Sequence, residues 1–300
     1  MSSRSALMLI VAATIASSVG CTDGRDGDDP AAPSTSLPAA STTTVGSGDR
    51  SETGEGAPLG ASLPASSGAT SWWRPTPGAS FAWQLRGRID PDRIDAEVVD
   101  VDGFDTPAAT VDRIHERGGH AVCYVSVGSF EDWRPDAASF PDEVLGAPLD
   151  GWEGERWLDV RRLDALEPIM ASRMDRCRER GFDGVEADNV DGFQNDSAFP
   201  LSASDQLVFN RRMAAMAHDR GMSFALKNDL AQIPELVDAV DFAVVEQCAE
   251  FDECDRLDPF VRAGKAVFAV EYEACPPEVP TGFTMLRLPL KLDGSSRQTC

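Results

Sequence analysis

The stretch GFDGVEADNVDGF, Gly181–Phe193, places acidic side chains inside and directly after a short apolar segment with the composition of a buried strand. Solvated loops accept carboxylates freely, whereas an apolar interior tolerates a charge only where it is paired or neutralised. Glu186 and Asp188 are therefore unusual for a strand that only builds a core. Their position predicts a strand end that carries chemistry.

Short apolar segments alternate with longer helical patterns on both sides of this stretch. Helices are expected at Pro107–Arg117, Leu163–Arg180, Ala203–Arg220 and Cys254–Ala263. Crossover helices between strands imply a parallel sheet, and about eight strands predict closure into a (β/α)8 TIM-type barrel. A doubly wound open sheet is the alternative, but no glycine-rich phosphate turn follows an early strand. The expected strands are Phe81–Leu85, Glu97–Val101, His120–Ser126, Gly184–Asp188, Ser223–Lys227, Phe242–Gln247, Ala266–Tyr272 and Gly282–Leu288.

Polar residues recur at the carboxyl ends of these expected strands, where TIM-type barrels build their active sites. The acids of the opening stretch belong to this series, which explains why they end a buried strand. The series consists of Asp100 and Asp102, Tyr124 and Ser126, Glu186 and Asp188, Lys227 to Asp229, Glu246 and Gln247, and Glu271 and Tyr272.

The positions of the histidines and serines argue against several reaction classes. His115, His120 and His218 lie in or beside helical patterns, away from the strand ends. This placement argues against a Ser–His–Asp triad and against a His-rich zinc site. The sequence also has no G-x-S-x-G nucleophile elbow.

Two carboxylates in unequal environments can break a glycosidic bond, because one must be ionised and the other protonated. Asp188 and Glu246 end strands that lie two apart around the expected barrel, so both can reach one bound sugar. A magnesium site where these acids converge with Glu271 is the alternative. Sugar rings could stack on aromatic side chains, each of which is individually more typical of packing: Trp83, Tyr124, Trp133 and Trp152.

Six segments follow one another in the order that a known family shows. They are CYVSVGSFEDWRPD (Cys123–Asp136), PLDGWEGERWLDVR (Pro148–Arg161), GFDGVEADNVDGF, LKNDL (Leu226–Leu230), EQCAEFDEC (Glu246–Cys254) and GKAVFAVEY (Gly264–Tyr272). Over roughly Trp83 to Tyr272 they resemble glycoside hydrolase family 114, the endo-α-1,4-polygalactosaminidases. The resemblance implies a barrel that cleaves α-1,4-linked galactosamine polymers, and neither a cofactor nor a metal is expected. Carried over to this chain, it implies Asp188 as the nucleophile and Glu246 as the acid/base.

The chain departs from the family pattern at two positions. Ala187 stands where the family often has proline, and Phe193 stands where tyrosine is common. Neither change touches a catalytic atom, so only fine substrate preference is put in doubt. The substrate-binding candidates, each of which could instead serve a structural contact, are Trp83, Asp102, Tyr124, Asp191, Lys227, Asn228 and Glu271.

The charge of the chain agrees with a cationic partner. The chain carries 27 basic and 50 acidic residues, of which residues 1–72 hold 3 and 7, so the remainder stands near −19. Such a field repels nucleic acid and attracts a polycation, although acidic surfaces also serve solubility alone. A de-acetylated amino-sugar polysaccharide is cationic, and Asp102, Asp191 and Glu271 are the candidates to hold its ammonium groups. No nucleic-acid partner and a monomeric chain are expected.

The first 72 residues predict export. Residues 1–20 combine Arg4, an apolar run and small residues, which is the plan of a signal peptide. The following Cys21 completes SSVGC, which resembles a bacterial lipobox with Ser18 where leucine is favoured. Lipid attachment at Cys21 is expected, with plain secretion or an unmodified cysteine as alternatives. From Thr22 to about Ser71 the chain has almost no large apolar residues. Residues 21–72 therefore predict a flexible linker before a single catalytic domain, residues 73–300.

Six further cysteines suit an exported domain with disulfides. Cys248 and Cys254 enclose a short loop after Glu246 and are expected to pair. Cys275 and Cys300 are expected to tie down the C-terminus. The sequence leaves open whether Cys123 and Cys177 pair or stay as buried thiols.

Two other functions remain alternatives on sequence grounds, one from another class and one that keeps hydrolysis. One is a surface-tethered glycan-binding protein on a catalytically silent barrel. The other is a hydrolase of a different or partly acetylated amino-sugar polymer. The acetylation preference and the stereochemical outcome depend on loop shape and on the distance between the two acids, which the sequence does not give.

Overall fold

The computed structural model describes residues 71–300. The predicted signal peptide, the lipidation site Cys21 and nearly all of the predicted linker lie outside the described residues. The described residues form one compact unit. Trp72, the last residue of the predicted linker, stacks on His218 with 4.1 Å between ring centroids, so the described packing begins one residue before the predicted domain boundary.

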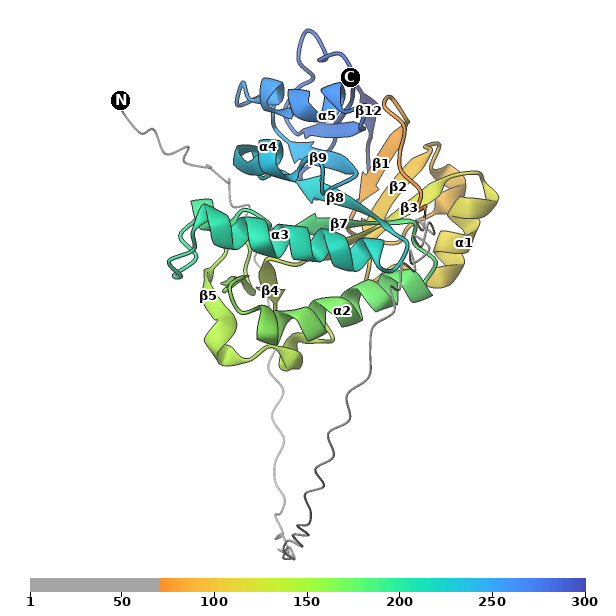
Figure 1. Ribbon diagram of the computed structural model, residues 1–300. Helices are drawn as coiled ribbons and strands as arrows, with labels where there is room; N and C mark the ends of the chain where they lie inside the picture. Colours follow the sequence, from red (N-terminus) through yellow and green to blue (C-terminus); the bar gives the residue numbers. More distant parts are fainter. Residues whose placement is uncertain (1–70) are drawn as a thin grey trace, which may run out of the picture. The chain divides into compact units, whose positions relative to one another are not determined.

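Within residues 71–300, eight parallel strands follow one another in chain order around a curled sheet (Figure 1). A short antiparallel strand, β12 (Gln298–Thr299), extends its last edge. Thr284 Oγ1 on the last parallel strand donates to Ala79 O beside the first one at 2.9 Å, which links the two edges. The expected TIM-type barrel class is thereby confirmed. The parallel strands are β1 (Phe81–Gln84), β2 (Val98–Asp102), β3 (His120–Ser126), β7 (Gly184–Asp188), β8 (Ser223–Lys227), β9 (Phe242–Glu246), β10 (Val267–Glu271) and β11 (Phe283–Arg287).

The four expected helices are present, with ends that differ by a few residues. They are α1 (Ala108–Glu116), α2 (Leu163–Glu179), α3 (Ala203–His218) and, for the fourth, a 3-10 turn η6 (Cys254–Leu257) that continues into α5 (Asp258–Arg262). The short α4 (Ile233–Leu236) was not anticipated. Other 3-10 turns are η1 (Pro91–Arg93), η2 (Ala137–Ser139), η3 (Asp142–Val144), η4 (Gly192–Gln194) and η5 (Leu230–Gln232).

Local chemistry explains the ends of α3. The Ser202 side chain accepts from the Asp205 backbone N–H while the Asp205 carboxylate accepts from the Ser202 N–H, which makes a capping box. These contacts satisfy two backbone donors that the first helical turn leaves free. After the helix, Gly221 adopts φ 70°, a left-handed conformation that glycine reaches at little cost.

A small antiparallel sheet is inserted between β3 and α2, and the sequence did not predict it. It consists of β4 (Ser129–Glu131), β5 (Leu145–Pro148) and β6 (Glu155–Leu158) in the order β4–β6–β5. These strands are only three or four residues long, and their glycine, proline and acidic residues have the composition of a loop. The insertion follows the carboxyl end of β3, so it belongs to the face of the barrel where the acids were expected.

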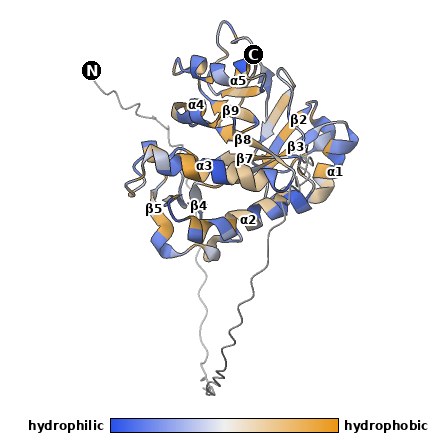
Figure 2. Ribbon diagram, in the orientation of Figure 1, coloured by the Kyte–Doolittle hydropathy of each residue, from blue (hydrophilic) through white to orange (hydrophobic). Residues whose placement is uncertain are grey.

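Successive side chains of each barrel strand point to opposite faces, as the strand geometry requires. Inward-facing Trp83, Val122, Val244 and Val270 belong to an interior cluster, and the intervening residues pack with the helices in a larger outer cluster. In Figure 2 the barrel strands are largely apolar, and the helices around them carry both apolar and polar residues.

Three disulfides cross-link the domain. Cys248–Cys254 and Cys275–Cys300 are formed, as predicted from the sequence. The open question about the remaining pair is answered by a Cys123–Cys177 bond, which joins β3 to α2. Among residues 71–300, no helix is both long and apolar enough to cross a membrane.

Candidate active site

A single ammonium group bridges the two acids that the sequence singled out. Lys227 Nζ, at the end of β8, lies 3.2 Å from Asp188 Oδ1 and 2.6 Å from Glu246 Oε2. The three residues end adjacent strands β7, β8 and β9, and alternation directs all three side chains into the barrel mouth. The structure therefore brings Asp188 and Glu246 to one place on one face.

The carboxylates around Lys227 stabilise its positive charge. Its side chain is 4% exposed. Burial alone would lower the pKa of Lys227, but the surrounding carboxylates, with Asp188 and Glu246 contributing most, outweigh burial and raise that pKa. The residue is therefore an ammonium that can lie between two negative groups in neutral solution.

Asp188 is held by donors on both oxygens. Tyr124 Oη, on the neighbouring strand β3, donates to Oδ2 at 2.9 Å. The backbone N–H of Asn189 donates to Oδ1 at 2.9 Å, and Lys227 contacts the same oxygen. Donors on both oxygens fix the orientation of the carboxylate. An aspartate held in this way is oriented for attack on a bound sugar.

Glu246 has a different set of neighbours. Tyr272 Oη donates to Oε1, and Lys227 contacts Oε2. The Asn228 side chain lies beside the same group, since its Oδ1 accepts from the Glu246 backbone N–H at 3.0 Å. Lys227 and Asn228, which the sequence offered as sugar ligands or orienting groups, thus both contact the acids in this structure.

The backbone turns sharply where three of these strands end. Asn189, Asn228, Asp229 and Gln247 directly follow the ends of β7, β8 and β9, and all have positive φ, between 44° and 60°. A left-handed conformation costs a non-glycine residue about 1 kcal/mol or more and tends to cluster at functional sites. Asn and Asp tolerate it best, which accounts for the residues found there.

A buried acid pair lies below the bridging lysine. Glu186 and Asp100 are both fully buried, and Trp83 Nε1 donates to Glu186 Oε2 at 2.9 Å. Burial raises the pKa of Glu186 to about 7, while burial and the neighbouring Glu186 raise the pKa of Asp100 well above its ordinary value. The Trp83 ring, 4% exposed, carries Lys227 Nζ at 5.4 Å from its centroid, so Trp83 supports the lysine from below.

Two predicted substrate ligands are engaged elsewhere. Asp102 forms a buried ion pair with Arg134 at 2.8 Å and accepts from the Phe104 N–H. Glu271 faces outward from β10, where its Oε1 accepts from the Ala249 N–H at 2.9 Å. The structure does not bring Glu271 to Asp188 and Glu246, so the three acids do not form the cluster that a magnesium site would need. Across residues 71–300, no group of three or more His, Cys, Asp or Glu side chains is placed to hold a metal ion.

Asp191 and the aromatic candidates lie at or near the rim in different settings. Burial raises the pKa of Asp191 to about 6, and the Asp188 charge adds to the effect, so Asp191 is close enough to sense the pair. Trp133 and Trp152 are 50% and 41% exposed on the segment around the inserted sheet. One face of Trp152 is covered by the Arg86 guanidinium at 5.6 Å.

Asp229 should make the domain less stable as pH rises. Its side chain is buried, and burial, followed by the Asp191 charge, raises its pKa to about 8. Between about pH 4, where an unfolded aspartate ionises, and pH 8, the folded chain holds a proton that the unfolded chain releases. The free energy of unfolding therefore falls with pH across that window, by at most about 1.4 kcal/mol per pH unit from this group.

Asp229→Asn is expected to flatten that dependence, because the amide cannot ionise and Asn tolerates the left-handed backbone at φ 44°. Urea unfolding at pH 5 and pH 8 measures the change. Asp252→Asn is the matched control, since Asp252 is exposed and has a similar φ of 57°. An equal loss of stability between pH 5 and pH 8 in wild type and Asp229→Asn would contradict the assignment.

Sequence reasoning missed three groups that contact the acids or their neighbours. Tyr272 was noted at a strand end but not chosen, although it follows Val270 in the inward-facing row and Glu271 does not. Asn189 was passed over beside Asp188. Glu155, on β6, accepts from Asn189 Nδ2 at 3.1 Å, and no local pattern marks it, because its strand was not predicted.

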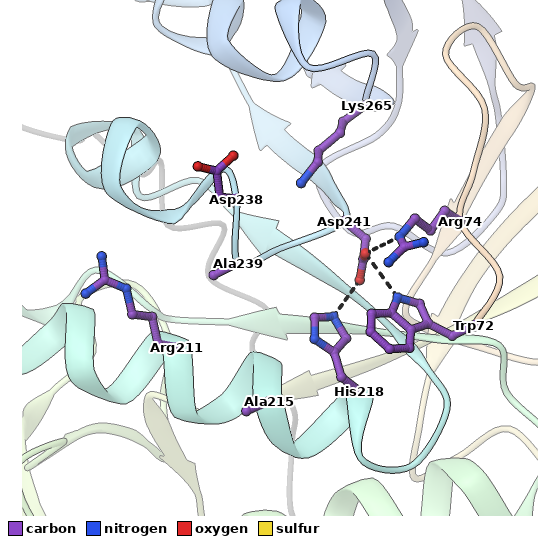
Figure 3. Close-up of a pocket in the computed structure, with 9 residues that line it drawn as sticks. All are labelled: Trp72, Arg74, Arg211, Ala215, His218, Asp238, Ala239, Asp241 and Lys265. Atoms are coloured by element: carbon purple, nitrogen blue, oxygen red, sulfur yellow. Dashed lines mark hydrogen bonds and ion pairs between the residues drawn. The ribbon is translucent and has the colours of Figure 1, made fainter. Parts of the chain in front are cut away.

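A separate pocket lies at the other end of the barrel (Figure 3). Asp241 immediately precedes β9, and it accepts from Trp72 Nε1 at 3.0 Å and contacts His218 Nε2 at 2.7 Å. Arg74 and these two hydrogen bonds hold the pKa of Asp241 at about 2 despite its burial. This network fixes residues 72–74 to the amino ends of the strands, away from Asp188.

The sequence model described as glycoside-hydrolase family GH114 matches residues 62–294. The chain belongs to this family. The barrel and its paired rim acids are consistent with that membership, and this GH114 chain is a glycosidase.

Solved structures resemble the GH114 chain over most of its length. Ega3 from Aspergillus fumigatus, solved in complex with galactosamine, is 33% identical, covers 77% of this chain and 98% of its own, and superposes with a TM-score of 0.71. The glycoside hydrolase domain of PelA from Pseudomonas aeruginosa is 19% identical, covers 73% and 98%, and has a TM-score of 0.58. The second likeness shows the fold alone.

A relative from Deinococcus radiodurans, an uncharacterised protein, is 28% identical over 203 residues of the GH114 chain. The match covers 59% of this chain and 65% of that relative. The chain therefore spans slightly less than two thirds of the length of this relative.

Proposed function

We propose that this chain cleaves α-1,4-linked galactosamine polymers of exopolysaccharide at internal bonds. Asp188 attacks the anomeric carbon, and Glu246 protonates the leaving oxygen and then activates water. The observation that carries the proposal is the contact of one ammonium, that of Lys227, with both carboxylates. Two acids on one face, separated by a gap of about a sugar's size, are what glycosidic cleavage requires.

The spacing of the acids favours retention of configuration. The two contacts of Lys227 Nζ, at 3.2 Å and 2.6 Å, limit how far Asp188 Oδ1 and Glu246 Oε2 can lie apart. The two oxygens cannot lie farther apart than the sum of these two distances, which is below the ~6.5 Å lower limit for inverting enzymes. Retaining pairs lie about 5–5.5 Å apart. That spacing of the nearest oxygens supports a covalent glycosyl–Asp188 intermediate.

The substrate class rests on similarity and on charge. Ega3, the relative solved with galactosamine, is 33% identical to this chain. The acidic domain would concentrate a polymer of de-acetylated galactosamine, because each residue of that polymer carries an ammonium group. Asp191, which is half-buried and whose pKa responds to the charge of Asp188, is the candidate to accept one of these groups.

Export of the enzyme is consistent with its cross-links. Three disulfides suit an oxidising compartment, where an exopolysaccharide would also be met. Lipid attachment at Cys21 remains a prediction from the sequence. Release of the Cys21→Ser chain from a membrane fraction that retains the wild type would support the anchor.

Mass spectrometry of products from defined polymers tests the proposal. De-acetylated poly-α-1,4-galactosamine should yield oligomers of several lengths early in the reaction, since an endo-acting enzyme cuts internal bonds. Early release of monomers alone would contradict the endo mode. Binding without shortening would favour the glycan-binding alternative, and shortening of only acetylated or glucosamine polymers would favour the alternative substrate.

A further inference from the structure

Asn189 connects Asp188 to the inserted sheet. Its backbone N–H donates to Asp188 Oδ1 at 2.9 Å. Its side-chain Nδ2 points the other way and lies 2.9 Å from Ser126 Oγ, 3.1 Å from Ser129 Oγ and 3.1 Å from Glu155 Oε1. One residue therefore contacts the proposed nucleophile through its backbone and the insertion through its side chain.

The chain approaches Asn189 so closely that only glycine fits beside it. A Cβ at Gly128 would stand 1.6 Å from Asn189 O. The N–H groups of Val127 and Gly128 both donate to Asp188 O, at 3.1 Å and 3.2 Å. The backbone of Asp188 and Asn189 is thus clamped by the segment that leads from β3 into the insertion.

Glu155 is the acceptor at the centre of this clamp. It is 6% exposed, and its Oε1 accepts from both Ser129 Oγ and Asn189 Nδ2. A hydrogen bond to a carboxylate is roughly twice as strong as one between neutral groups. Glu155 is too buried for a direct role at a polymer, so its influence must pass through the residues it holds.

We propose that Glu155 is a positioning residue for Asp188 and acts through the side chain of Asn189. The inference rests on the proposed catalytic role of Asp188. By fixing the Asn189 amide, Glu155 holds the left-handed turn at φ 60° that directs the Asn189 N–H at the carboxylate. The inserted sheet thereby sets the orientation of the group that attacks the sugar.

NMR resonances of the backbone and side-chain amide groups of Asn189 test the link between Glu155 and Asn189 without substrate. Burial raises the pKa of Glu155 to about 7, with Asp188 and Glu131 adding to it and Arg134 opposing it; Tyr124 also faces this group. In the wild-type chain, the Nδ2 and backbone signals of Asn189 should shift together with a midpoint near pH 7. In Glu155→Gln the size of this pH-dependent change in the Asn189 chemical shifts should fall by at least half.

An internal reference separates this titration from the one below Lys227. Glu186 also titrates near pH 7, and the Trp83 Nε1–H signal reports on it because the two groups are hydrogen-bonded. That signal should titrate equally in wild type and Glu155→Gln. An undiminished Asn189 step in the variant would overturn the proposal.

Kinetic measurements on the polymer are the second test of the proposed role of Glu155. Glu155→Gln should lower kcat about tenfold or more and leave KM within about twofold, because the variant loses orientation at the reacting atom rather than substrate contact. Glu153→Gln, two residues away and exposed, is the matched control and should match the wild type. An unchanged kcat in Glu155→Gln, with a cleaving wild type, would overturn the positioning role alone.

A double-mutant cycle shows whether the effect passes through Asn189. Asn189→Gly removes the side chain while accepting the positive φ. In the Asn189→Gly background, Glu155→Gln should cause little further loss in kcat, whereas additive losses would overturn the proposed route. A wild type that leaves every amino-sugar polymer intact would refute the proposed function, and the resonance comparison would still decide the link between Glu155 and Asn189.

Discussion

Asp188→Asn is expected to reduce kcat on the polymer by at least about 10³-fold, because the amide cannot form the covalent glycosyl intermediate. Glu246→Gln is expected to lower kcat by about 10²–10⁴-fold, the usual contribution of a general acid–base residue. Product formation from de-acetylated polygalactosamine measures both. Glu250→Gln, an exposed acid four residues after Glu246, is the matched control and should retain wild-type rates.

Leaving-group dependence distinguishes the two roles. An oligogalactosamine with an activated aryl leaving group departs without protonation, so Glu246→Gln should recover much of its first-step rate on that substrate. Asp188→Asn should stay inactive on it, since no nucleophile is available. Wild-type cleavage of the polymer by either variant would remove the proposed mechanism, and equal recovery by both would remove the assignment of roles.

Lys227→Met is expected to damage both stability and activity. The substitution leaves Asp188 and Glu246 facing each other without the cation that contacts both. Breaking a buried ion pair by removing one partner costs about 3–5 kcal/mol, which corresponds to a loss in Tm on the order of 10 °C for a domain of this size. We expect kcat/KM to fall by at least about 10²-fold, since the cation that contacts both acids no longer fixes their positions.

The pH dependence of the Lys227→Met defect identifies its cause. Carboxyl groups carry less charge in acid, and the loss of the Lys227 cation matters only where its neighbours are charged, so the difference in Tm from wild type should grow from acid to neutral pH. Lys291→Met is the matched control, because Lys291 pairs with Asp293 at 3.0 Å but is 67% exposed, and exposed pairs contribute little. A Tm difference that does not grow with pH would argue that Lys227 serves packing rather than charge.

The sequence located the strands of the barrel because their signal is local. Apolar segments of five to seven residues, separated by helical patterns with glycine ends, reproduce all eight parallel strands to within one residue at each end. The inserted sheet was not predicted, because its strands carry no clear local signal. Strands of three or four residues contain too few alternations to differ from a loop, and β4–β6 are stabilised by pairing with each other.

Which side chains of a strand point into the barrel was harder to predict than the position of the strand. In β10, apolar residues fill both the inward and the outward row, so the sequence gives no alternation from which to choose between Glu271 and Tyr272. The structure places Tyr272 against Glu246 and Glu271 against the Ala249 backbone. A shift of one residue exchanges the two faces of a strand, which is why the choice between neighbours needed the structure.

What the sequence determined by itself is the inventory: an acidic domain, a set of polar strand ends, and the two acids of a GH114 chain. These follow from residue identity and short-range spacing, which are visible in one dimension. What only the tertiary structure decided is which groups meet. The bridge from Lys227 to both acids, the support from Tyr124 and Tyr272, and the clamp through Asn189 to Glu155 join distant segments, and such contacts exist only after the sheet has curled and its inward rows face one another.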